Sequence, residues 1–161
     1  MKIVIISAVA RNGVIGRSNG DMPWHVKEEF QHFKNTTLGY PIIMGRITYE
    51  TLGKPLKDRL NVVITNQPDY SLPYKEVKIF RTLTEAIEAI SKIDPKKIFI
   101  IGGGQVYRQA IEFADEMIIS IMKFDAEGDV FFPEIKPARW KEVSKEERDQ
   151  FDILTYIKTN D

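Results

Sequence analysis

The 161-residue chain contains no cysteine, and this absence excludes several kinds of site at once. Disulfide frameworks, zinc–thiolate centres and thiol nucleophiles all need that residue. The chain has only two histidines, His25 and His32, and their spacing does not match that of a metal site. We therefore predict that the protein binds no metal and that both histidines occupy exposed helical positions.

The sequence also lacks an excess of either charge and any long apolar run. Lys and Arg number 23, as do Asp and Glu, whereas a nucleic-acid-binding protein usually shows a basic excess. No segment approaches the roughly 18 unbroken apolar residues of a transmembrane helix. The apolar run Ile3–Ala10 is followed by Arg11 without a small-residue cleavage site, which is typical of a strand rather than of a signal peptide. We expect a cytoplasmic protein with no nucleic-acid or membrane partner.

What the chain does contain is the composition of a globular domain, with 43% hydrophobic and 29% charged residues. Its length fits one domain, which we expect to span residues 1–161. Period-2 and β-branched patterns predict strands, and apolar residues at helical spacing predict helices between them. The predicted strands are Lys2–Ala10, Pro41–Met44, Asn61–Thr65, Val77–Phe80, Lys97–Ile101, Glu116–Lys123, Trp140–Ser144 and Phe151–Lys158, and the predicted helices are Val26–Thr36, Ile47–Leu52, Leu83–Ser91 and Gln105–Phe113.

Strands and helices alternate through the first two-thirds of the chain, and only strands follow. This order predicts an α/β fold with a mostly parallel sheet flanked by helices and with antiparallel strands added at the C-terminal end. Thr82-Leu83-Thr84-Glu85 is a capping box, and Gly53 suits a left-handed helix cap. Three long loops remain, and long loops on such scaffolds are often functional. They are Arg11–Pro23, Asn66–Lys75 and Asp125–Arg139.

Two adjacent carboxylates, Glu28 and Glu29, lie early in the first predicted helix. At about 100° per residue, Phe30 and Phe33 lie on its apolar face, Glu29 falls on the flank of that face, and Glu28 points nearly opposite. A carboxylate at the edge of a buried stripe is costly without a partner. Glu29 is thus either a surface residue near a boundary or a functional acid, and the preceding Met22-Pro23-Trp24 turn favours the second interpretation.

Two strand ends run through glycine into a predicted helix. One is Ile101-Gly102-Gly103-Gly104, and the other is Gly45-Arg46-Ile47-Thr48. Backbone N–H groups at such junctions can face a phosphate, and an Arg beside them suits a phosphate ester. The alternatives are a tight turn at the first junction and a surface Arg with a helix cap at the second. The dinucleotide fingerprint is absent, because Tyr107 stands where a third spaced Gly is needed.

Together these motifs resemble dihydrofolate reductase of the bacterial chromosomal type. The sequence departs from the family pattern at two positions. Glu29 occupies a position at which most bacterial members have Asp, and Lys27 occupies a position at which many members have Pro. The motifs follow the order of the family from about residue 3 to the C-terminus. They are Asn12-Gly13-Val14-Ile15-Gly16, Met22-Pro23-Trp24, Ile43-Met44-Gly45-Arg46, Gly53-Lys54-Pro55-Leu56, Arg59-Leu60-Asn61, Ile101-Gly102-Gly103-Gly104, and Glu127-Gly128-Asp129 before Phe132-Pro133.

The resemblance implies an eight-stranded, mostly parallel sheet and a monomer in which dihydrofolate and NADPH meet in one cleft. It implies hydride transfer from NADPH to C6 of the pterin, with protonation at N5 promoted by Glu29. The product, tetrahydrofolate, would supply one-carbon metabolism and nucleotide synthesis, and antifolates would block the site.

The resemblance also implies roles for individual residues. The residues implied in catalysis are Glu29, Met22, Trp24 and Tyr107. Those implied in binding dihydrofolate are Ile6, Ser7, Glu29, Phe30, Phe33, Leu52, Arg59, Ile101 and Ser120. Those implied in binding NADPH are Ala8, Ile15, Gly16, Gly45, Arg46, Ile47, Thr48, Thr65, Asn66, Gly102, Gly103, Gly104, Gln105 and Val106.

Four of these implied roles are specific enough to compare with a structure. Arg59 would grip the carboxylate of the substrate's glutamate tail, a task that suits guanidinium. Arg46 would bind the 2′-phosphate of NADPH. Gly102–Gly103 would form a cis peptide, and Asp129 would help to hold the Arg11–Pro23 loop as a lid over the reacting rings.

Two other functions remain as alternatives. One is a pyrimidine reductase of riboflavin synthesis with the same fold, which shares the cofactor edge but lacks the Met-Pro-Trp segment and the Arg59 site. The other is a nucleotide-binding regulatory module, which would keep both glycine junctions but has no use for a carboxylate in a cleft.

Overall fold

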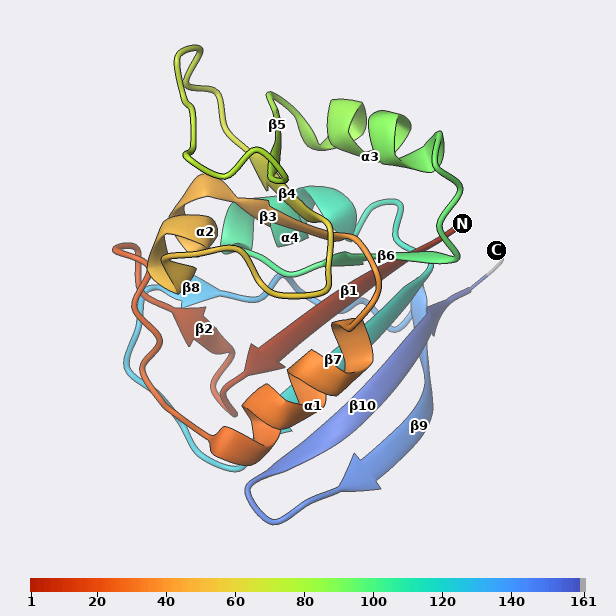
Figure 1. The fold of residues 1–161 in the computed structure, drawn as a ribbon. Helices are drawn as coiled ribbons and strands as arrows, with labels where there is room; N and C mark the ends of the chain where they lie inside the picture. The colour runs from red at the N-terminus through yellow and green to blue at the C-terminus, as the bar shows by residue number, and fades with distance from the viewer. Residues whose placement is uncertain (160–161) are drawn as a thin grey trace.

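A computed structural model describes residues 1–159 of the chain. Its elements alternate as the sequence predicts (Figure 1). They are β1 (Lys2–Val9), β2 (Val14–Gly16), α1 (Lys27–Thr37), β3 (Ile42–Gly45), α2 (Arg46–Leu52), β4 (Asn61–Ile64), β5 (Lys78–Phe80), α3 (Leu83–Ser91), β6 (Lys97–Ile100), α4 (Gly104–Ala110), β7 (Glu116–Met122), β8 (Val130–Phe131), β9 (Trp140–Glu147) and β10 (Phe151–Lys158).

Eight of the strands form one sheet in the order β5-β4-β3-β6-β1-β7-β10-β9. Neighbouring strands from β5 to β7 pair in parallel, and β10 pairs antiparallel with both β7 and β9. The predicted fold class is therefore confirmed, as a single α/β domain with antiparallel strands at the C-terminal end. The carboxyl ends of β1, β3 and β6 meet at one edge, which is where ligands bind in open sheets of this kind.

Helices cover both faces of the sheet. Because successive side chains of a strand point to opposite faces, each central strand contributes side chains to two clusters. Along β1, Ile5 packs in a cluster with the buried side chains of α3 and α4. Val4 and Ile6 pack in a second cluster with Phe33 of α1. Figure 1 shows α1 crossing in front of the sheet. Both faces are therefore dry, which explains the unbroken apolar strands in the sequence.

The structure contains two short strands that the sequence does not predict. β2 and β8 pair antiparallel in a separate two-stranded sheet and lie within segments expected to be loops. Strands of three and two residues are too short to show a period. β9 also continues to Glu147, past the predicted end at Ser144. The residues after Trp140 are all exposed and, apart from Val143, polar, so they give no alternating pattern that would mark the end of the strand.

Local signals at helix ends are confirmed. Thr82 Oγ1 accepts a hydrogen bond from the Glu85 N–H at 3.1 Å, as a capping box requires. Gly53 ends α2 with φ of 78°, in the left-handed region that glycine adopts without strain. In residues 1–159, no helix is long and apolar enough to cross a membrane, and no cluster of acidic and histidine side chains is arranged to hold a metal.

Candidate active site

Glu29 is a buried carboxyl group on the sheet side of α1. Its residue is only 7% exposed, whereas the adjacent Glu28 is exposed, as the helical geometry predicts. The side chain interacts with the hydroxyl of Ser120, which is itself buried on β7. Ser120 lies opposite Ala8 of β1 in the sheet. The fold thus brings Glu29 of the first helix to the middle strands, more than 90 residues away from Ser120 in the sequence.

The environment of Glu29 sets its protonation. Burial raises its pKa to about 7, and the interaction with Ser120 opposes this by favouring the charged form. In residues 1–159, no Lys, Arg or His side chain forms an ion pair with it. A carboxyl group with a pKa near neutrality can hold and release a proton at physiological pH, which is what an acid–base residue needs.

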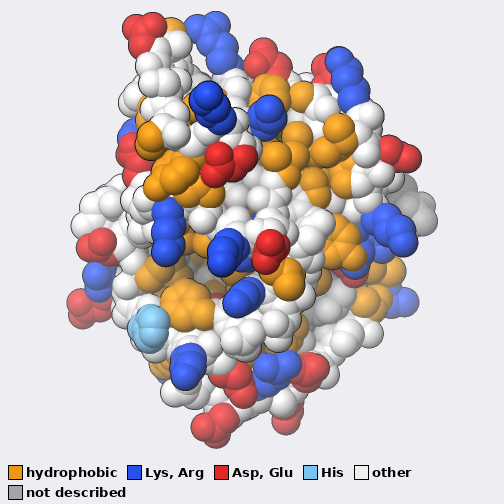
Figure 2. Space-filling model, in the orientation of Figure 1, with side chains coloured by type: hydrophobic (Ala, Val, Ile, Leu, Met, Phe, Trp, Pro, Cys, Tyr) orange, Lys and Arg blue, Asp and Glu red, His pale blue; other side chains and the backbone are white. Residues whose placement is uncertain are grey.

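Apolar side chains surround this part of the sheet. Ile6 is buried, and half-buried Phe33 and Ile101 pack on the same cluster, so the structure brings these three predicted wall residues together. Phe30 on α1 and Leu52 on α2 remain 40% and 39% exposed. Figure 2 shows hydrophobic side chains gathered around a hollow in this face, with Lys and Arg side chains near its rim. Exposed apolar surface of this kind is typical of a ligand site.

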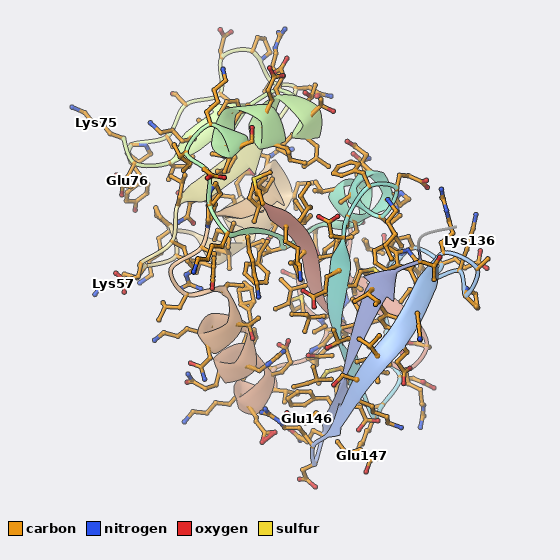
Figure 3. All side chains as sticks on the ribbon, turned by 90° about the vertical axis from the view of Figure 1, so that its right-hand side faces the viewer. Lys57, Lys75, Glu76, Lys136, Glu146 and Glu147 are labelled. Atoms are coloured by element: carbon orange, nitrogen blue, oxygen red, sulfur yellow. The ribbon has the colours of Figure 1, made fainter. Side chains whose placement is uncertain are left out.

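Arg59 is held in place by hydrogen bonds to neutral groups. Its Nη1 donates to Thr37 Oγ1 at 3.1 Å, and its Nε donates to the Lys57 carbonyl at 2.9 Å. In residues 1–159 it forms no ion pair, and Figure 3 shows the neighbouring Lys57 pointing outward. Burial lowers the pKa of Arg59 from its ordinary value. A fixed, half-buried guanidinium without a carboxylate is suited to bind an anionic group of a ligand.

The two glycine junctions lie against each other at the edge of the sheet. The Gly45 N–H donates to the Gly102 carbonyl at 2.8 Å, and the peptide between Gly102 and Gly103 is cis, as the resemblance implies. A Cβ on Gly103 would lie 3.3 Å from Thr48 Oγ1. Beyond them, the first turn of α4 leaves N–H groups without partners inside the helix. Val106 is buried, and its Cγ2 would lie 3.4 Å from a Cβ on Gly45, so its side chain packs against the second junction.

Tyr107 is buried beside the candidate site. Its hydroxyl donates to the Ile6 carbonyl at 2.8 Å, and the residue is 4% exposed. Burial raises its pKa, and it also interacts with the Ser7 hydroxyl and with the charge of Glu29. Trp24 packs edge-on against Phe124, at a ring distance of 5.8 Å. Tyr107 therefore contacts the main chain of β1, and Trp24 contacts the segment that follows β7.

The Arg11–Pro23 loop is tied to the 125–139 segment. Asp129 accepts a hydrogen bond from the Ser18 N–H at 2.8 Å, and this interaction lowers the pKa of Asp129. Pairing of β2 with β8 adds a backbone connection between the two segments. A Cβ on Gly20 would lie 2.2 Å from Thr51 Oγ1, so the loop packs tightly on α2. Met22 at the end of the loop remains 43% exposed.

Comparison with known proteins identifies the family of the chain. A sequence model of the family described as dihydrofolate reductase matches residues 2–158. The dihydrofolate reductase of Neisseria gonorrhoeae is 42% identical over 149 residues, which cover 92% of this chain and 89% of that protein. The chain belongs to the dihydrofolate reductase family. It is therefore an NADPH-dependent oxidoreductase.

Further comparisons extend the match to other organisms and to the fold. The dihydrofolate reductase of Bacillus subtilis is 36% identical over 165 residues, which cover 98% of this chain and 95% of that protein. A solved structure of dihydrofolate reductase from Enterococcus faecalis, complexed with NADP(H) and RAB-propyl, is 30% identical. It superposes with a TM-score of 0.88 and covers 99% of this chain and 97% of its own.

The residues at the sheet edge fit the cofactor that dihydrofolate reductases use. Apart from the glycine junctions, the edge offers the Arg46 guanidinium and the hydroxyls of Thr48 and Thr65 as donors. Thr65 Oγ1 already accepts from the Gln67 N–H at 3.2 Å, and Asn66 beside it is exposed. Backbone N–H groups, hydroxyls and a guanidinium are the donors that phosphate groups need.

Asn61 and Thr37 support the candidate site, and the sequence alone assigns a role to neither of them. Asn61 is 2% exposed and bonds the Leu56 N–H and the carbonyls of Leu56 and Arg59, so it fixes the loop that carries Arg59. Thr37 orients the Arg59 guanidinium. The position of Asn61 in the Arg59-Leu60-Asn61 motif could have indicated its role. No neighbouring residue indicates the role of Thr37, because its partner Arg59 lies 22 positions away.

The prediction for His32 is wrong in one respect. His25 is exposed, but His32 is half-buried, and its Nε2 is buried without a hydrogen-bond partner in the described structure. Burial and the charge of Arg148 lower its pKa, and Glu146 opposes this. Figure 3 shows Glu146 at the tip of the β9–β10 hairpin, near the start of α1. Packing against a hairpin more than 100 residues away in the sequence is not visible in the helical pattern of α1.

Proposed function

We propose that the chain reduces 7,8-dihydrofolate to 5,6,7,8-tetrahydrofolate and that Glu29 is the residue that promotes protonation of the pterin at N5. The observation that carries this proposal is a single carboxyl group, buried beside an apolar wall, with a pKa raised to about 7. Bound NADPH would supply the hydride that is transferred to C6. The chain supplies binding, orientation and control of one proton.

Glu29 binds and polarises the pterin in this proposal. A carboxylate in a dry site can accept hydrogen bonds from an exocyclic amino group and a ring N–H, and these bonds are stronger than in water. The reacting ring becomes more cationic as the hydride arrives, so a nearby negative charge stabilises the transition state more than the ground state. Ser120 holds the carboxyl group from below.

The apolar wall and the loop orient the rings and exclude water. Ile6, Phe33 and Ile101 form a surface against which a flat ring can pack. Met22 lies on the loop that Asp129 ties down, and we propose that this loop closes over the reacting rings. Excluding water strengthens the electrostatic effect of Glu29 and holds the rings in contact, as hydride transfer needs.

Arg59 and the glycine junctions bind the two distal ends of the ligands. Arg59 would form a bidentate pair with the carboxylate of the glutamate tail. Gly102–Val106 would take the pyrophosphate through backbone N–H groups, and Arg46, Thr65 and Asn66 would surround the 2′-phosphate. The tetrahydrofolate formed would enter one-carbon metabolism and nucleotide synthesis.

The assignment of Arg46 predicts selective loss of one cofactor. Arg46→Ala should weaken NADPH binding by roughly 10- to 100-fold, because charge-assisted hydrogen bonds contribute about 1.5–3 kcal/mol, and should leave NADH binding almost unchanged. Fluorescence titration of the purified protein with each cofactor measures both constants. The control is Arg139→Ala, which removes an exposed Arg that is paired with Glu112 at 2.8 Å, outside the proposed cofactor site. Equal losses for NADPH and NADH would contradict the assignment.

A single assay tests the proposed reaction. The purified protein is mixed with NADPH and dihydrofolate, and the absorbance of NADPH is followed. We expect oxidation that depends on dihydrofolate and is blocked by an antifolate. Oxidation with a riboflavin-pathway pyrimidine instead would favour the same-fold pyrimidine reductase, and cofactor binding without any oxidation would favour a regulatory module. Either result would overturn the proposal.

A further inference from the structure

Arg46 is not free in this structure, because it is paired with Glu50 on its own helix. Arg46 Nη1 lies 2.6 Å from Glu50 Oε1, one helical turn further along α2. In residues 1–159, Glu50 is the one side chain that hydrogen-bonds this guanidinium. The two side chains are 30% and 47% exposed, so the pair lies at the surface, where an incoming ligand can reach it. The guanidinium that the proposed function assigns to a phosphate therefore already has an anionic partner.

We propose that Glu50 competes with the 2′-phosphate of NADPH for Arg46 and so limits how strongly this enzyme prefers NADPH to NADH. This proposal rests on the proposed function, which places that phosphate at Arg46. A phosphate monoester carries a charge of about −1.5 to −2 near neutral pH, so it is repelled by a carboxylate that shares its guanidinium. NADH has an uncharged hydroxyl at this position, so the charge of Glu50 does not repel it.

The surroundings of Glu50 allow it to give up Arg46. Tyr70, in the Asn66–Lys75 loop, is half-buried beside α2, and its hydroxyl interacts with Glu50. Burial raises the pKa of Tyr70, and the charge of Glu50 adds to this effect, while Arg46 opposes it. The neutral hydroxyl remains as a donor for Glu50 when Arg46 turns to the phosphate. Tyr70 therefore offers Glu50 a nearby hydroxyl as an alternative partner.

The test is to remove the charge of Glu50 and keep its shape. Glu50→Gln retains an oxygen that can accept from Arg46, so it preserves the orientation of the guanidinium and removes only the competing charge. Dissociation constants for NADPH and NADH are measured at low and high ionic strength. We expect NADPH to bind roughly two- to fivefold more tightly, the range that exposed ion pairs cover, and NADH binding to stay unchanged. The gain should shrink at high ionic strength, because salt screens exposed charges.

A matched control is available at the opposite edge of the sheet. Glu112→Gln removes the carboxylate charge from the exposed Arg139–Glu112 pair, whose N–O distance is 2.8 Å, near the end of α4. Figure 3 shows Lys136, which precedes Arg139 by three positions, on the side of the molecule opposite Lys57. This variant should leave the affinity for both cofactors unchanged. An equal gain in the control would mean that net charge, rather than Glu50, governs NADPH binding, and would overturn the proposal.

Other outcomes separate this inference from the proposed function. Weaker NADPH binding in Glu50→Gln would show that Glu50 positions Arg46 for the phosphate, and unchanged binding would show that it has no effect; either would overturn competition. Both results would leave dihydrofolate-dependent oxidation of NADPH intact. If Arg46→Ala instead loses NADPH and NADH binding equally, the phosphate does not lie at Arg46, and the inference fails together with that part of the proposed function.

Discussion

Replacing Glu29 by Gln should lower turnover at neutral pH by at least about 100-fold, since a positioned acid–base group contributes about 10²–10⁴-fold. Gln keeps the shape of the side chain but carries no charge, so it cannot stabilise the cationic pterin. Activity should recover partly in acid, where the substrate arrives already protonated. Steady-state assays of kcat across the pH range measure both effects.

The adjacent residue provides the control for this experiment. Glu28 is also a carboxylate in the first turn of α1, but it is exposed. Glu28→Gln is the same chemical change on an exposed side chain and should retain full turnover and the pH profile of the unchanged protein. Full neutral-pH activity in Glu29→Gln would remove Glu29 from the mechanism, whatever the control shows.

Glu29→Gln should also make the fold more stable at high pH. Burial raises the pKa of Glu29 from 4.5 to about 7, so the folded state binds this proton more tightly than the unfolded state. The stability that this preference provides is present in full below about pH 4.5 and is lost as the pH rises through about 7. At about 1.4 kcal/mol per pKa unit, ionised Glu29 costs the fold about 3 kcal/mol.

Gln does not ionise and does not carry this cost. Glu29→Gln should therefore raise the free energy of unfolding by about 3 kcal/mol at pH 8 and by little near pH 4.5. Urea denaturation at several pH values measures the difference. A gain that is independent of pH, or one that Glu28→Gln shares, would show that the carboxyl group is not strained by burial. Higher stability with lower activity is the trade-off expected at a functional site.

Much of this fold is predictable from the sequence because its strands and helices are long enough to show a period. Ile98–Ile100 is an unbroken apolar run, and it is β6 at the centre of the sheet. Thr82 and Glu85 form the capping box that predicts the start of α3. β2 and β8 are not predictable, because each is held by the other across more than 100 residues rather than by its own pattern.

The candidate site is also predictable from the sequence only in part. The helical position of Glu29 predicts that it is more buried than Glu28, and the structure agrees. The carboxyl group's raised pKa depends on the sheet behind it and cannot be read from α1 alone. The Arg46–Glu50 pair has the i, i+4 spacing that favours such contacts on a helix, so this signal was present in the sequence. The spacing alone does not show whether Arg46 pairs with Glu50 or with a phosphate, because a guanidinium suits both partners.

The contact at Gly128 fixes where the Arg11–Pro23 loop meets the 125–139 segment. A Cβ at this position would lie 2.5 Å from the backbone oxygen of Gly16, in β2, so main chain meets main chain there. A contact of this kind does not depend on which side chains the tip of the loop carries. The Arg11–Pro23 loop is therefore fixed at Gly16 by a main-chain contact, and a side chain at position 128 would push the two segments apart.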